Sequence, residues 1–221
     1  MRRIRGFLLV MFVVLLLGWA RSMPAAPQAQ DCCHPSAAKT NKPTPVPAAG
    51  VKAMSPVTTN EMREEFNVSS DKVRIVALLS PACPGCQSGH EVVGRILKKF
   101  SSLELHAILV WEPMRSDDSP WVATQQAEKV RDVRIWQGWN GNKNLGKLFG
   151  ETLNLHDVAW DVYLLYKPGI KWEAEEPPAP TFWMHQLQGV NSKLLLCADP
   201  TRLSAEVGKL LGDSEDVPHG N

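Results

Sequence analysis

Two cysteines separated by two residues form the motif of this sequence with the clearest chemistry. Cys83 and Cys86 enclose Pro84 and Gly85, which gives CPGC. A cysteine pair with this spacing exchanges electrons with other thiols and disulfides, or it supplies two sulfur ligands to a metal ion. We interpret the pair as redox-active. A static structural disulfide and a metal site are the alternatives.

The residues around the motif predict a strand before it and a helix after it. The apolar run 73–80 (VRIVALLS) is typical of a strand buried on both faces. Between residues 84 and 100, apolar residues recur at helical spacing. Cys83 would then lie at the first turn, where unpaired backbone N–H groups stabilise a thiolate and lower the thiol pKa from about 8.5. We therefore expect Cys83 to attack disulfides and Cys86 to resolve the mixed disulfide.

Other patterns predict an α/β domain around this unit. A second strand is expected at 103–111, which with the first strand and the helix makes a parallel βαβ unit. A long helical region is expected over 119–153, interrupted by a Gly-rich stretch. Later strands are expected at 161–166, 181–187 and 193–197, before a terminal helix that begins at Asp199 and Pro200.

Strand, CxxC, amphipathic helix and second strand in this order resemble the thioredoxin-like superfamily. The tail fits the resemblance, because Pro180-Thr181-Phe182, a Gly189 turn, KLLLC and a final helix follow in the order of a thioredoxin. The resemblance implies a central mixed β-sheet flanked by helices, with a helical insertion at 112–150 between the second and third strands. It also implies a cis-proline beside the cysteines, and we predict Pro180 with Thr181 as this substrate-docking element. In an alternative register Asp161 takes the place of the proline.

The resemblance implies a thiol–disulfide oxidoreductase that needs no cofactor beyond its own disulfide. Its partners would be protein thiols and disulfides, with an upstream redox protein that resets the pair. The alternative is a soft-metal carrier, in which His90 on the helix and His185 after Pro180 join the two cysteines. Sulfur and imidazole ligands suit Cu(I), so copper enters only under this alternative. Ala77 stands where thioredoxins carry an internal acid that helps the resolving cysteine lose its proton.

The N-terminal residues predict export. Residues 1–22 place three arginines before a short apolar run, as in a signal peptide, so we expect a periplasmic or secreted protein. It would meet a membrane only if this segment stays uncleaved. The Ala/Pro-rich residues 23–57 predict a disordered linker before a folded domain at 58–213 and a flexible tail at 214–221. A net charge of +1 gives no electrostatic reason to expect a nucleic-acid partner.

Three further cysteines lie outside the motif. Cys32 and Cys33, followed by His34, could capture a metal or pass on disulfides, but we interpret them as an incidental pair in the linker. Cys197 ends an apolar run, and we expect it to be a buried core residue.

Overall fold

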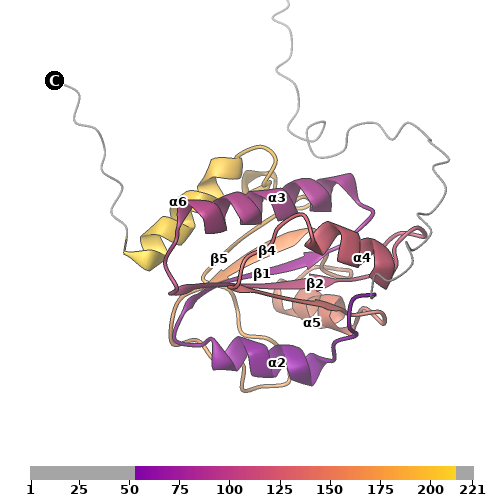
Figure 1. Ribbon diagram of the computed structural model, residues 1–221, viewed down its shortest axis with the longest axis horizontal. Coiled ribbons are helices and arrows are strands. Elements are labelled where there is room, and N and C mark those ends of the chain that lie inside the picture. Colours follow the sequence, from indigo (N-terminus) through magenta and orange to yellow (C-terminus); the bar gives the residue numbers. More distant parts are fainter. Residues whose placement is uncertain (1–52, 213–221) are drawn as a thin grey trace, which may run out of the picture.

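A mixed five-stranded sheet forms the centre of the computed structural model (Figure 1), and its strands have the order β3-β2-β1-β4-β5. β1 (Val73–Leu79) pairs in parallel with β2 (Leu105–Trp111), which pairs in parallel with β3 (Ile135–Trp139). β4 (Val162–Tyr166) runs antiparallel to both β1 and β5 (Phe182–His185). Because β1 is the central strand, all its residues are buried, as its apolar sequence predicts.

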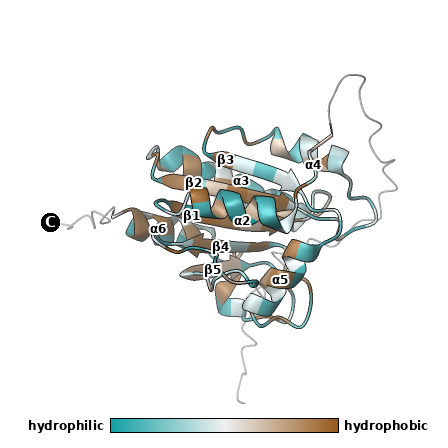
Figure 2. Ribbon diagram, turned by 90° about the horizontal axis from the view of Figure 1, so that it is seen from below, coloured by the Kyte–Doolittle hydropathy of each residue, from teal (hydrophilic) through white to brown (hydrophobic). Residues whose placement is uncertain are grey.

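Helices cover both faces of this sheet (Figure 1). α3 (Pro84–Lys99) and α6 (Pro200–Leu211) pack their apolar side chains into one core. α2 (Thr59–Val68) and α5 (Asn144–Thr152) pack into a second core on the opposite face. Figure 2 looks onto α2, which buries Met62 and Phe66 and turns a largely hydrophilic side outward.

The structure describes residues 53–212. The predicted signal peptide, most of the predicted linker with Cys32, Cys33 and His34, and the predicted tail lie outside this range. Packing begins before the predicted domain start, because the Val57 N–H donates to the Trp139 carbonyl at 2.9 Å. Within the described range, no helix combines the length and apolarity needed to cross a membrane.

The predicted thioredoxin-like architecture is confirmed, and the insertion between the second and third predicted strands differs from the expectation. It contains β3 between α4 (Pro120–Ala127) and α5, so it is not wholly helical. β3 is an edge strand, and within it only Gly138 and Trp139 are buried. Its sequence therefore needs no continuous apolar run of the kind that marks a central strand. Gly138 is required there, since a Cβ atom would lie 2.0 Å from the Val57 side chain that crosses it.

The segment before α6 also differs from its prediction. Residues 193–197 were expected to form a strand, but the structure has a short 3₁₀ helix at Ser192–Leu194 and a single bridge between Leu195 and His185. Cys197 is half-buried and disulfide-bonded. The prediction that Cys197 is a buried core residue is therefore wrong. α6 begins as predicted, with Asp199 accepting a hydrogen bond from the Arg202 N–H.

Candidate active site

The CPGC motif lies where β1 meets α3, as the sequence predicts. Cys83 is the N-cap of α3, and Pro84 occupies the first helical turn. The Cys86 N–H donates to the Cys83 sulfur at 3.5 Å, and the Ser80 N–H donates to the Cys86 sulfur at 3.3 Å. Both thiols are free, so the helix N-terminus presents a reduced pair.

The two thiols occupy different environments. Cys83 is 5% exposed and Cys86 is 0% exposed. The hydrogen bond from Cys86 lowers the pKa of the Cys83 thiol. Burial raises the pKa of Cys86 well above its ordinary value, and the hydrogen bond to Cys83 adds to the rise. Cys83 is therefore the thiol that ionises first and that a partner reaches first.

A third acid, Asp161, lies beside the pair. Its Oδ2 atom is 3.9 Å from the Cys83 sulfur, and the residue is 1% exposed. Its φ of 52° is left-handed, a conformation that aspartate adopts more readily than most other side chains. Its N–H donates to the Leu78 carbonyl at 2.7 Å, and its carbonyl accepts from the Gln186 N–H at 2.9 Å. Backbone hydrogen bonds to β1 and to Gln186 therefore fix Asp161 beside the thiols.

Two donors orient the Asp161 carboxylate. The Tyr163 hydroxyl donates to Oδ1 at 2.8 Å, and the Gln186 side-chain amide donates to the same atom at 2.9 Å. Gln186 also donates to the Gly85 carbonyl inside the CPGC motif at 2.8 Å. Gly89 on α3 leaves room for Tyr163, since a Cβ there would lie 1.7 Å from the hydroxyl oxygen. Oδ1 is therefore fixed by Tyr163 on β4 and by Gln186, which follows β5, while Oδ2 lies near Cys83.

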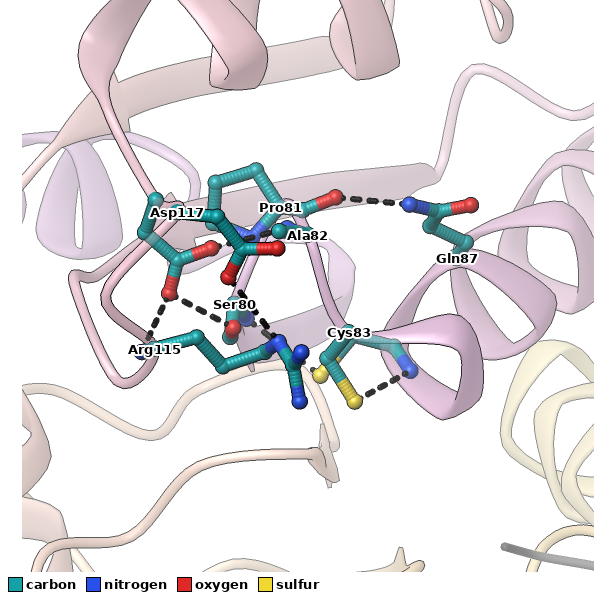
Figure 3. A network of polar contacts seen from close by, with 9 residues as sticks. Ser80, Pro81, Ala82, Cys83, Gln87, Arg115 and Asp117 are labelled. Atoms are coloured by element: carbon teal, nitrogen blue, oxygen red, sulfur yellow. Dashed lines mark hydrogen bonds and ion pairs between the residues drawn. The ribbon is translucent and has the colours of Figure 1, made fainter. Parts of the chain in front are cut away.

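Polar contacts also fix the turn that leads into the cysteines, as Figure 3 shows. Asp118 accepts from the Ser80 hydroxyl at 2.7 Å and from the Ala82 N–H at 2.8 Å. The Gln87 side chain donates to the Pro81 carbonyl at 2.9 Å. Asp118 thus holds the start of α3 from outside the helix, and Gln87 holds it from the first turns of α3 itself.

The predicted docking residues lie elsewhere. Pro180 is not a cis-proline, because no peptide bond between residues 53 and 212 is cis. Thr181 pairs with Leu165 near the end of β4, whereas the cysteines lie near its start. The apolar run of β4 takes the place beside β1, which leaves β5 at the sheet edge and brings Asp161 to the cysteines. The alternative register is therefore correct and the preferred one is wrong.

Neither predicted histidine ligand lies with the thiols. His90 is 1% exposed and packs edge-on against Trp111, with 5.1 Å between ring centroids. Burial lowers the pKa of His90 to about 4, so its ring is neutral at pH 7. His185 uses both ring nitrogens in its own loop, with contacts to the Leu187 N–H and the Asn191 carbonyl at 3.0 Å each. Within residues 53–212, the potential metal-ligating group that lies with the two sulfurs is the carboxylate of Asp161.

Asp161 was foreseen only as an alternative, and Glu112 was not foreseen. Glu112 follows β2 and is fully buried, and its Oε1 accepts from the Gly146 N–H at 2.9 Å. Burial raises its pKa to about 7. A charged residue directly after an apolar strand was the available signal for Glu112.

An open groove adjoins the site. Its volume is about 780 Å³, and its wall includes Trp160, which precedes Asp161, and Gln186, which binds Asp161. Residues 154–158 and 187–190 form the rest of the lining. The groove is therefore lined by residues that flank or bind Asp161, but not by Asp161 or the cysteines.

The sequence matches no protein-family model and no curated protein. Among solved structures, a thioredoxin-like protein in its oxidised form is 17% identical, with a TM-score of 0.45 over 78% of this chain and 97% of its own. A thiol:disulfide interchange protein from Bacteroides sp. is 14% identical, with a TM-score of 0.40 over 76% of this chain and 92% of its own. A secreted Mycobacterium tuberculosis disulfide oxidoreductase is 9% identical, with a TM-score of 0.39 over 66% of this chain and 85% of its own.

The strand order and the position of the CxxC motif define the fold of the chain. On one side of β1 lie β2 and β3, which run parallel to it, and on the other side lies β4, which is antiparallel to both β1 and β5. The CxxC motif lies at the N-terminus of the helix that follows the central strand. This arrangement gives the chain a thioredoxin-like fold.

Proposed function

We propose that the protein is an extracytoplasmic thiol–disulfide oxidoreductase that exchanges disulfides with protein partners through Cys83 and Cys86. The observation that carries the proposal is the asymmetry of the pair. Cys83 has a lowered pKa at a helix N-terminus, whereas Cys86 is fully buried with a raised pKa. A thiol that ionises readily next to a thiol that stays protonated is what stepwise exchange requires.

The exchange takes two displacement steps. The Cys83 thiolate attacks one sulfur of a partner disulfide, which forms a mixed disulfide and releases the other partner sulfur as a thiolate. Cys86 then loses its proton and attacks the Cys83 sulfur, which releases the second partner thiolate and closes the Cys83–Cys86 disulfide. The partner gains the two electrons that the CPGC pair loses, and the reverse sequence oxidises a partner dithiol. An upstream redox protein is needed to reset the pair.

Two features support a location outside the cytoplasm. Residues 1–22 have the composition of a signal peptide. Cys197 is disulfide-bonded, and stable disulfides are typical of oxidising compartments. The free pair at the start of α3 would then be the redox-active one.

A redox titration tests the proposal. The protein is equilibrated in glutathione buffers with a metal chelator, and the thiols are trapped and counted. We expect a reversible two-electron couple between about −120 and −270 mV that is lost in a Cys83→Ser, Cys86→Ser double variant. A pair that stays reduced or stays oxidised across this range would exclude exchange as the function.

A further inference from the structure

Cys83, Cys86 and Asp161 form a compact group of potential metal ligands. Their sulfur and carboxylate atoms all lie within 4.8 Å of one another, and all three residues are buried. We propose that the reduced site binds one zinc ion through the two sulfurs and Oδ2 of Asp161, with the fourth coordination position open. The proposal requires reduced Cys83 and Cys86, but it does not require that they exchange disulfides with a partner.

The distance within the group suits zinc. Ligands at about 2.3 Å (sulfur) and about 2.1 Å (oxygen) on a tetrahedral zinc ion lie roughly 3.6 Å apart. The Cys83 sulfur and Oδ2 of Asp161 are 3.9 Å apart. Small side-chain rotations are therefore sufficient to place both atoms on one ion.

The carboxylate is already held as a metal ligand would be. Ligating side chains are usually oriented by hydrogen bonds to their other polar atom. Here Oδ1 of Asp161 accepts from Tyr163 at 2.8 Å and from Gln186 at 2.9 Å. The ordered Asp161 backbone and these two bonds keep Oδ2 on the side of the thiols.

Charge favours a divalent cation over Cu(I). Two thiolates and a carboxylate carry three negative charges, so a divalent ion leaves one and a monovalent ion leaves two. The negative charge of Asp161 opposes ionisation of both thiols, whereas a bound cation attracts all three groups. Carboxylate oxygen is a common zinc ligand, but Cu(I) prefers sulfur and imidazole.

Binding moves protons but no electrons. Two S–H bonds are lost, two zinc–sulfur bonds form, and two protons pass to the solvent. The disulfide form has no thiolate to offer, so zinc binds only the reduced state. By linkage, zinc shifts the CPGC redox equilibrium towards the dithiol.

The test compares metal binding by four versions of the reduced full-length protein, using Zn²⁺ in competition with a chromophoric chelator and Co²⁺ as an absorbing probe. Wild type is expected to bind one more ion than the Cys83→Ser, Cys86→Ser variant, with sulfur-to-cobalt charge-transfer bands and tetrahedral cobalt absorption. Asp161→Asn keeps a side chain that tolerates the left-handed backbone, and we expect it to bind Zn²⁺ about 100-fold more weakly. Glu112→Gln, which changes another buried carboxyl, should bind as wild type does.

The variants separate the possible results. All of them retain Cys32, Cys33 and Cys197, so binding at those cysteines cancels in each comparison. A reversible CPGC couple in Asp161→Asn, measured without metal, shows that the site is still folded. Equal affinity of wild type and Asp161→Asn, or equal binding by the double-serine variant, overturns the zinc site. Loss of the couple in metal-free wild type contradicts the proposed exchange and leaves the zinc comparison intact.

Discussion

The two ends of β1 each bury ionisable side chains, but with opposite kinds of partner. At one end the Arg74 guanidinium donates to the Phe66 and Lys167 carbonyls at 2.9 and 3.1 Å and lies 4.2 Å from the centroid of the Phe66 ring. At the other end Cys83 and Cys86 face Asp161. A cation among acceptors is stabilised in its charged form, whereas the negative charge of Asp161 opposes ionisation of both thiols.

This contrast separates a structural cluster from a reactive one. Burial lowers the pKa of Arg74 to about 10, which still leaves it charged at pH 7. The protonation of the cysteine end depends on which acid ionises first, and a disulfide or a cation relieves the repulsion between them. We therefore expect substitutions at the Arg74 end to change stability, and substitutions at the cysteine end to change chemistry.

The largest effect is expected from single cysteine variants. Cys83→Ser removes the nucleophile, so disulfide exchange should fall to the rate without protein. Cys86→Ser keeps the nucleophile but lacks the resolving thiol, so it should accumulate mixed disulfides with partner proteins. Gel analysis after acid trapping measures both. Mixed disulfides that form with Cys83→Ser as readily as with Cys86→Ser would reverse the assigned roles.

Arg74→Met should give the largest loss of stability. The substitution leaves the buried Phe66 carbonyl and the partly buried Lys167 carbonyl without their charged donor and removes the ring contact with Phe66. We therefore expect a loss of about 4 kcal/mol in the free energy of unfolding. Denaturant titration measures the loss. The redox potential of the CPGC pair should stay unchanged in the folded fraction, and a shifted potential would show that the two ends are coupled.

Glu112 gives the cysteine end of the sheet a pH-dependent stability. Its folded pKa is about 7 and its ordinary value is 4.5, so the folded state holds the proton more tightly. Stability from this group is therefore full below pH 4.5 and falls by about 3 kcal/mol as pH rises to about 7. Glu112→Gln should flatten this part of the stability profile, as unfolding midpoints at pH 4.5, 6 and 7.5 would show. A slope equal to that of wild type would contradict the raised pKa.

The central elements could be predicted because their signals are local. β1, α3 and β4 each combine an apolar pattern with a clear end, and CPGC marks the strand–helix junction. β3 could not be predicted in the same way, because its place at the sheet edge leaves its apolar pattern weak.

The position opposite the cysteines depends on a non-local choice. Either β4 or β5 could pair with β1 from its sequence alone, and that choice decides whether Asp161 or Pro180 meets the thiols. The structure favours β4, whose five residues are all buried. The more apolar strand takes the more buried position beside β1. This signal was present in the sequence, but the prediction of Pro180 gave more weight to the spacing of the C-terminal elements.

A smaller effect, on the Cys83 pKa and the CPGC potential, is expected from Asp161→Asn. Removing the negative charge beside Cys83 should lower the Cys83 pKa further, by about one unit, or about 1.4 kcal/mol. A more stable thiolate favours the reduced state, so the potential should rise by about 30 mV where Cys83 is ionised. The thiolate absorbance against pH and the glutathione titration measure the two shifts. A rise in the Cys83 pKa would show that Asp161 stabilises the thiolate instead of opposing it.

The smallest effect is expected from a matched pair of tyrosine variants, one at each end. Tyr163 donates to Asp161 at 2.8 Å, and Tyr166 donates to the Pro178 carbonyl at 3.0 Å. Loss of either hydroxyl should lower the free energy of unfolding by about 1 kcal/mol. Only Tyr163→Phe should also change the CPGC potential, because only Tyr163 orients the carboxylate that acts on Cys83. A Tyr166→Phe variant that changes the potential by the same amount would mean that general destabilisation, and not the position of Asp161, sets the redox behaviour of this end of the sheet.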